Sequence, residues 1–152
     1  MESGMNRVAE DKVIYDALKI LKNRFKRGTT LSSPAQVQEY LVLKLAQYER
    51  EVFMVMFLDT RHRVIKMEEM FFGTLDGACV YPREVVKEAL GCNAGAVIVC
   101  HNHPSGVSEP SLADQAITRR LKDALLLVEI RMLDHFVIAG GTTVSMASRG
   151  ML

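Results

Sequence analysis

Two uninterrupted apolar runs constrain the fold of this chain more than any other feature of its sequence. Residues 52–58 are seven apolar side chains in a row, and residues 94–100 form a second continuous run. A strand with one solvated face alternates apolar and polar residues, whereas a strand covered on both faces does not alternate. We therefore expect both runs to be buried strands of one sheet, and the first run to lie in its centre.

Two helices are predicted before the first of these strands. Over residues 13–25 apolar residues recur at steps of four, three and four, which predicts one apolar face: Ile14, Leu18, Leu21 and Phe25. Ser33 and Pro34 are typical of an N-cap and a first helical position, and Gln36 fits a capping box. The second helix continues with the apolar stripe Val37, Leu41, Leu45 and Tyr48.

The rest of the chain predicts further strands, two more helices and a mixed sheet. Strands are expected over residues 64–72, near Val80, over 133–139 and over 142–146. One helix is expected to begin at Tyr81-Pro82-Arg83-Glu84 and to end at Gly91 as its C-cap, with buried Val85, Val86, Ala89 and Leu90. Another is expected from Ser111, with the stripe Ile117, Leu121, Leu125 and Val128. A hairpin turn at Gly140 and Gly141 excludes an all-parallel sheet. The predicted fold class is α/β, a mixed and mostly antiparallel sheet flanked by helices.

The composition restricts the function classes. The chain has 152 residues, enough for one domain whose core folds without a structural metal, so a metal would serve chemistry. With 19 basic and 18 acidic residues the net charge is +1, which argues against a domain that mainly coats nucleic acid or an anionic membrane. The chain has three cysteines, Cys79, Cys92 and Cys100, and no Cys-x-x-Cys pair. All three are predicted to be reduced residues of the core. Without a signal peptide or a long apolar stretch, we expect a cytoplasmic protein that has no membrane partner.

A polar, glycine-bearing segment at residues 27–32 indicates a hinge between two parts of the chain. Residues 1–30 are then an N-terminal helical extension, and residues 31–152 are the core domain. Basic residues gather near the end of the first helix: Lys19, Lys22, Lys26 and Arg27. Cations there complement the helix dipole, so a solvated surface is the favoured interpretation, and weak nucleic-acid contact is the alternative.

Residues 101–114 contain the side chains that point to chemistry. If the second buried strand continues through His101 and His103, the two imidazoles lie on the same face of the sheet. Pro and Gly residues then turn the chain back, and Asp114 falls in the first turn of a helix capped by Ser111. Two His and one carboxylate are the three protein ligands of a catalytic zinc site, which leaves a fourth position for water.

Alternative interpretations of these residues differ in strength. Ser111 and Asp114 have the spacing of a capping box, which needs no metal, and a single His at a strand end is usually structural. A His pair that leaves a buried strand and is joined by a turn to an acid is harder to explain by packing. A zinc nucleobase deaminase would have Glu where His103 stands and a later Pro-Cys-x-x-Cys. An HNH nuclease is excluded because its motif residues are not contiguous.

The arrangement resembles a known family. His101-x-His103, the seven residues 104–110 and Ser111-x-x-Asp114 resemble the signature of the JAMM metalloproteases, also called JAB or MPN. The resemblance is greatest to the RadC-like branch and extends from residue 31 to residue 152. It rests on His-Asn-His-Pro-Ser-Gly, Tyr81-Pro82-Arg83-Glu84-Val85, Leu133-Asp134-His135 and Arg149-Gly150-Met151-Leu152. The chain lacks the helix-hairpin-helix segment of the long members, so it resembles the short, prophage-type ones.

The resemblance implies a three-layer, cytidine deaminase-like architecture in which Zn²⁺ is held by His101, His103 and Asp114. It implies a general base at the head of the first buried strand, where Glu51 matches and Glu49 is a rival. A zinc ion held there would lower the pKa of a bound water to about 7, and Glu51 would take the proton. Ser111 is expected to donate a hydrogen bond to the oxyanion. Asp134 and His135 either orient a metal ligand through a hydrogen bond, without contacting the metal, or form a structural pair in the sheet.

The function expected on this basis is that of a zinc-dependent metallopeptidase or isopeptidase-like hydrolase acting on a peptide or protein substrate. Two alternatives stay open. One is a DNA-repair or mobile-element-associated accessory protein that binds nucleic acid, a role associated with the RadC-like branch. The other is a hydrolase of non-peptide substrates, since zinc, water and a carboxylate do not specify a substrate.

Overall fold

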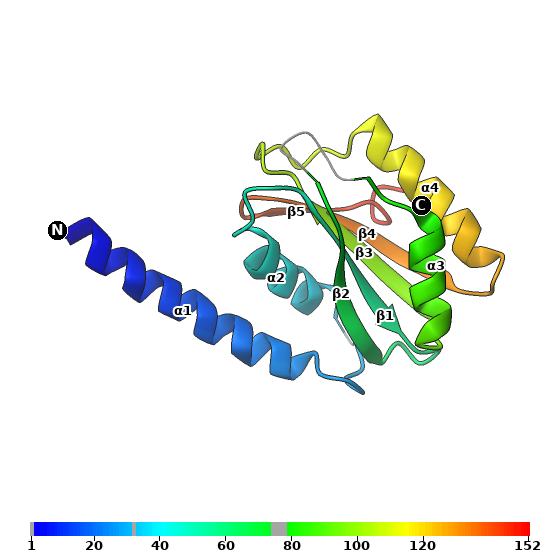
Figure 1. Cartoon of the computed structure of the whole chain (residues 1–152), viewed down its shortest axis with the longest axis horizontal. Helices are drawn as coiled ribbons and strands as arrows, with labels where there is room; N and C mark the ends of the chain where they lie inside the picture. The colour runs from blue at the N-terminus through cyan, green and yellow to red at the C-terminus, as the bar shows by residue number, and fades with distance from the viewer. Residues whose placement is uncertain (1, 32, 74–78) are drawn as a thin grey trace.

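The first apolar run forms a strand in which every residue is buried, β1 (Val52–Leu58). The computed structural model describes residues 2–31, 33–73 and 79–152 and arranges five strands in the order β2-β1-β3-β4-β5 (Figure 1). The other strands are β2 (Val64–Phe72), β3 (Ala96–Asn102), β4 (Arg131–Ala139) and β5 (Thr142–Ser145). β3 and β4 are parallel and the other neighbours are antiparallel, which confirms the mixed, mostly antiparallel sheet.

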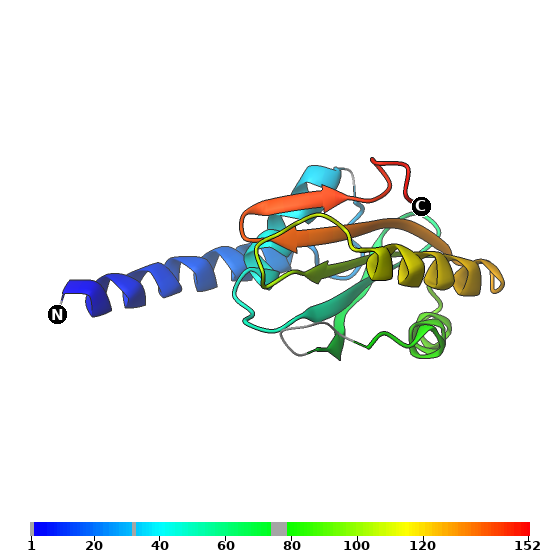
Figure 2. The same cartoon turned by 90° about the horizontal axis from the view of Figure 1, so that it is seen from above.

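Helices cover both faces of this sheet, as two non-alternating strands require (Figures 1 and 2). On one face α2 (Pro34–Leu45) packs with the even-numbered residues of β1, such as Met54 and Met56. On the other face α3 (Pro82–Gly91) and α4 (Leu112–Leu126) pack with its odd-numbered residues, such as Val55. The expected three-layer α/β architecture is confirmed, and a large apolar core lies on each face of the sheet.

The first helix is longer than the apolar periodicity predicts. α1 runs over Glu2–Arg24 and projects away from the sheet (Figures 1 and 2). Near its C-terminal end Leu18 and Leu21 pack against the core, and Phe25, just beyond the helix, is buried. The apolar side chains Val8, Val13, Tyr15 and Ile20 are exposed. Packing against the core therefore stabilises only the C-terminal part of α1. None of the described helices is long and apolar enough to cross a membrane.

The structure corrects four local predictions. Ser33 is the N-cap of α2, but its side chain makes no capping hydrogen bond and Gln36 is exposed. Val80 packs against the core without belonging to a strand, because the chain enters α3 two residues later. Leu90 lies on the outer side of α3, where its side chain is exposed. Cys79 is exposed and Cys92 half-buried, so only Cys100 is a fully buried cysteine.

Candidate metal centre

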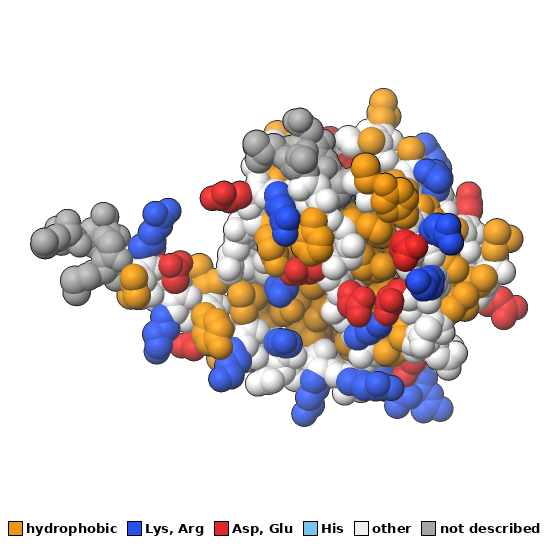
Figure 3. All heavy atoms as spheres, viewed as in Figure 1, with side chains coloured by type: hydrophobic (Ala, Val, Ile, Leu, Met, Phe, Trp, Pro, Cys, Tyr) orange, Lys and Arg blue, Asp and Glu red, His pale blue; other side chains and the backbone are white. Residues whose placement is uncertain are grey.

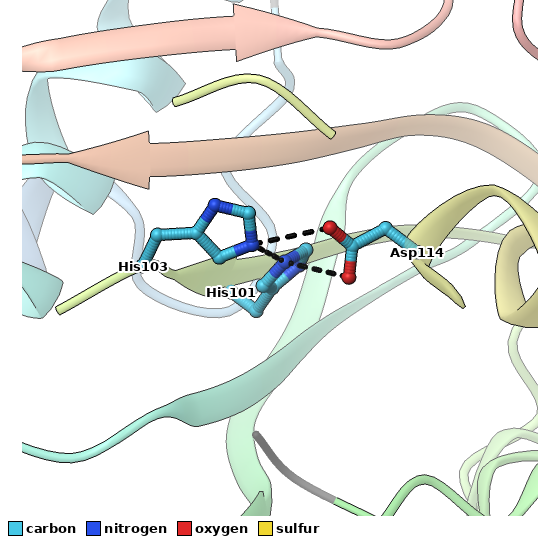
Figure 4. Close-up of side chains that lie close together, drawn as sticks. All are labelled: His101, His103 and Asp114. Carbon is cyan, nitrogen blue, oxygen red and sulfur yellow. Dashed lines mark hydrogen bonds and ion pairs between the residues drawn. The ribbon is translucent and has the colours of Figure 1, made fainter. Parts of the chain in front are cut away.

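Three elements bring the predicted ligands together at one end of the sheet. His101 belongs to β3 and faces α4, His103 lies just beyond the strand, and Asp114 lies in the first turn of α4. Figure 4 shows the three side chains pointing toward one another from these elements. His101 is 1% exposed and Asp114 is 9% exposed, so both residues are largely buried.

The distances between ligand atoms are short. His101 Nε2 lies 2.9 Å from His103 Nε2 and 3.2 Å from Asp114 Oδ1, and His103 Nε2 lies 3.1 Å from Asp114 Oδ2. One potential ligand atom from each residue lies within 4.8 Å of the others. Residues predicted from spacing alone therefore form a single cluster that has the composition of a three-ligand metal site.

The capping box is also present, so the two interpretations of Asp114 are compatible. Ser111 Oγ accepts a hydrogen bond from Asp114 N at 3.0 Å, and Asp114 Oδ2 accepts one from Ser111 N at 2.8 Å. The carboxylate has a second oxygen, Oδ1, which faces His101. The cap aims the carboxylate at the imidazoles because it fixes Asp114 at the start of α4.

Hydrogen bonding around His103 tests whether the cluster fits a cation. Its Nδ1 lies 2.7 Å from the carbonyl oxygen of Val107, which can only accept, so Nδ1 carries a proton. A neutral His103 then directs the lone pair of Nε2 at the Asp114 carboxylate. That contact is favourable only with a proton or a metal ion between the two groups. The residues present therefore fit Zn²⁺, which takes nitrogen and carboxylate ligands.

The electrostatics of the cluster favour a bound cation. Burial opposes ionisation of Asp114, but the contacts with the rings of His101 and His103 outweigh it and hold the pKa of this carboxyl well below its usual range. The bond with Asp114 raises the pKa of His103 despite burial, with a smaller contribution from the charge of Glu51. Asp114 is thus a carboxylate at neutral pH, and its charge is available to a metal.

The two candidate bases differ in their surroundings. Glu51 is half-buried immediately before β1, and its charge acts on His103, whereas Glu49 is exposed in the turn that follows α2. The side chain of Asn102 accepts a hydrogen bond from Val52 N at 2.7 Å and donates one to the carbonyl of Arg50 at 3.0 Å. Asn102 therefore holds the peptide groups on both sides of Glu51.

Asn102 is a residue whose role sequence reasoning missed. Strand alternation was the available signal: if His101 and His103 face α4, the residue between them faces the other side of the sheet. Its partners lie about fifty residues earlier in the chain, and the pairing of Phe53 with His101 brings them close. The amide is 4% exposed and its contacts are with the backbone.

Asp134 and His135, predicted to act together, have different hydrogen-bond partners. His135 is fully buried, and its Nε2 lies 2.8 Å from His101 Nδ1. Burial, with a contribution from His101, lowers the pKa of His135 well below its usual value. Asp134 instead accepts hydrogen bonds from Ala147 N and from the Ser145 hydroxyl, which holds the chain at the end of β5.

The chain matches one protein-family model and is similar in sequence to several bacterial proteins. The sequence model for the RadC-like JAB domain matches residues 31–151. A UPF0758 protein of Vibrio cholerae is 56% identical over 146 residues, which cover 96% of this chain and 92% of that protein. UPF0758 proteins of Nitrosococcus oceani and Vibrio parahaemolyticus are 58% and 60% identical over 132 residues, which cover 87% of this chain and 59% of each relative.

The chain therefore spans most of one relative and about three fifths of the other two. The name UPF0758 states no activity, so it adds nothing to the chemistry of the site. The match to the domain model covers β1 to β5 together with the His-His-Asp cluster. By this match and these identities, the chain belongs to the RadC-like JAB domain family.

Proposed function

We propose that this protein is a zinc-dependent hydrolase of peptide or isopeptide bonds, with His101, His103 and Asp114 as the metal ligands. The observation that carries the proposal is the convergence of two imidazole nitrogens and a carboxylate at distances of 2.9 to 3.2 Å. When bound, zinc supplies a water with a pKa near 7 and a Lewis acid that polarises a carbonyl. Three protein ligands leave a coordination position for this chemistry.

In this proposal Glu51 is the general base, because it is the half-buried carboxylate whose charge acts on His103. Asn102 keeps Glu51 in place through the two flanking peptide groups. Glu51 takes a proton from the attacking water and passes it to the leaving amine. Ser111 Oγ accepts the capping bond from Asp114 N, so its own proton is left to donate to a developing oxyanion. Such a donor contributes roughly 2.7 to 4 kcal/mol to the barrier in other hydrolases.

The metal part of the proposal is tested by elemental analysis of the purified protein. We expect one zinc per chain, and we expect His101→Ala and Asp114→Ala to lose it. Protein that contains no zinc, or that keeps its zinc after either substitution, contradicts the assignment of these ligands.

The hydrolase part is tested with a peptide library and mass spectrometry. Zinc-loaded protein should generate new peptide termini, and protein treated with a chelator should not. Glu51→Gln keeps the shape of the side chain but cannot take a proton, so it is the matched control. If zinc-loaded protein cleaves no peptide but hydrolyses another class of bond, the non-peptide alternative is correct.

A second function is favoured by a hollow on the opposite side of the sheet from His101. It has a volume of about 650 Å³ and is lined by Lys22, Lys26 and Arg27, with Phe25 and Tyr40 among its apolar residues. Figure 3 shows orange apolar side chains bordered by blue Lys and Arg side chains on this face. The acidic residues of the hollow are already paired: Glu68 with Lys66, and Glu69 with Lys44. Lys19 is exposed but does not line the hollow.

We propose that this basic hollow makes weak, salt-dependent contact with the phosphates of nucleic acid. Each phosphate contact contributes a slope of about 0.9 to the fall of log affinity with log salt. Replacing Lys22, Lys26 and Arg27 by Gln should flatten that slope. Unchanged binding in this variant contradicts the proposal, and tight sequence-specific binding at physiological salt would favour the accessory-protein alternative.

A further inference from the structure

Two buried polar side chains lie behind His101, on the side away from the other ligands. Thr118 in α4 and His135 in β4 are both fully buried. Thr118 Oγ1 lies 2.6 Å from His135 Nδ1, and His135 Nε2 lies 2.8 Å from His101 Nδ1. Thr118 Oγ1 also donates to the carbonyl oxygen of Asp114 at 2.6 Å. The row of contacts therefore connects two of the three proposed ligand residues, Asp114 and His101.

The positions of the protons along this row follow from what each atom can do. The carbonyl oxygen of Asp114 can only accept, and two oxygens 2.6 Å apart need a proton between them. The single proton of the Thr118 hydroxyl is therefore used in that bond. Thr118 Oγ1 must then accept from His135, so Nδ1 of His135 carries a proton.

The same reasoning extends to His101. The ring nitrogens of His135 contact a hydroxyl and another imidazole, and full burial disfavours a charge that such neutral partners cannot compensate. A neutral His135 with a proton on Nδ1 has a lone pair on Nε2. His101 Nδ1 must supply the proton of the 2.8 Å contact. The lone pair of His101 is then on Nε2, the atom that faces Asp114 and His103.

We propose that Thr118 and His135 are positioning residues that fix His101 in the tautomer whose Nε2 is free to bind the metal. This inference rests on the proposed metal site and explains how its most buried ligand is prepared. Hydrogen bonds to the far nitrogen of a ligating His set its tautomer and ring orientation in metal sites generally. Here that role is filled by a neutral imidazole backed by a hydroxyl, and the hydroxyl also holds the Asp114 backbone.

The direct test needs no substitution. Long-range ¹H–¹⁵N NMR of the metal-free protein reports which ring nitrogen of each His carries the proton. We expect His101 and His135 both to be protonated at Nδ1. A proton on Nε2 of His101 with Nδ1 bare would overturn the proposal.

Substitution at Thr118 tests the origin of the tautomer. Thr118→Val keeps the shape but removes the hydroxyl, and we expect His101 to lose its single tautomer and zinc affinity to fall by about 10- to 100-fold, measured with a competing chelator. Thr118→Ser retains the hydroxyl and is the matched control, with affinity close to wild type. If Thr118→Val leaves both tautomer and affinity unchanged in a folded protein, Thr118 has no such role.

Substitution at His135 supplies a second, independent comparison. His135→Gln places a carbonyl oxygen within reach of His101 Nδ1, whereas His135→Leu offers no acceptor. We expect the Gln variant to bind zinc more tightly than the Leu variant, and equal affinities would contradict the proposal. None of these measurements uses hydrolysis. If these results are as expected but the protein cleaves no peptide, the tautomer proposal stands and the hydrolase proposal fails. If the protein cleaves peptides but these results are not as expected, the hydrolase proposal stands and the tautomer proposal fails.

Discussion

The two histidine ligands of the candidate metal centre have different surroundings. We call His101 of β3 and the side chains that contact it the strand half, and residues 103–110 the loop half. His101 in β3 is 1% exposed and is backed by two fully buried side chains, Thr118 and His135. His103 is less buried, and the backbone carbonyl that orients it belongs to Val107, in an exposed turn. Buried side-chain contacts are rigid, whereas exposed turns open at low cost in free energy. We therefore expect the strand half to keep its arrangement without a metal, and the loop half to change more if a metal binds as proposed.

Glu51 belongs to the strand half of the comparison, because Asn102 of β3 holds it. Glu51→Gln should therefore lower the rate of hydrolysis by about 10² to 10⁴ while zinc content and stability stay close to wild type. Single-turnover rates on a peptide recovered from the library, together with elemental analysis, measure both quantities. Glu49→Gln is the control, since an exposed carboxylate in a turn should hardly matter. Loss of turnover only in Glu49→Gln would mean that the base is misassigned, and loss of zinc in Glu51→Gln would make Glu51 a fourth ligand.

The two imidazoles should differ in what they contribute to stability without metal. His101→Ala opens a cavity and leaves His135 Nε2 without its partner, which we expect to lower the free energy of unfolding by about 3 kcal/mol. His103→Ala removes a contact with an exposed turn and should cost about 1 kcal/mol. Denaturant unfolding of the metal-free variants measures both changes. Equal losses in the two variants would show that the halves do not differ in rigidity.

Removal of zinc should affect the halves unequally. The core on both faces of the sheet is large enough to keep the fold intact. We expect faster amide hydrogen exchange at residues 103–110 after chelation and little change in β3. A global loss of protection would instead identify the metal as structural.

The smallest expected effect concerns the turn of the loop half. Gly106 has φ of +85° with open space around its Cα, so an added Cβ strains the backbone without a clash. Gly106→Ala should cost about 1 kcal/mol of stability. Gly141 also has open space but no such φ, so Gly141→Ala should be close to neutral. If thermal unfolding shows equal effects, the turn does not depend on its left-handed glycine.

Local signals predicted much of this fold. The bounds of β1 and β2 agree with the apolar patterns, because a continuous run or a long β-rich segment depends only on neighbouring residues. Asp114 could be placed beside the imidazoles because strand alternation, a Pro and Gly turn and an N-cap act within fourteen residues of the chain. The start of α4 was predictable for the same reason, since Ser111 caps it.

Contacts between distant elements were decided only by the tertiary structure. The role of Asn102 depends on the antiparallel pairing of β1 with β3, which brings Val52 to its side chain. The contact of His135 with His101 spans 34 residues and depends on the parallel pairing of β3 with β4. Strand register and helix docking set such contacts, and neither is a property of a local segment. The sequence by itself thus determined the proposed ligands, whereas packing of α4 and β4 against β3 determined which side chains hold them.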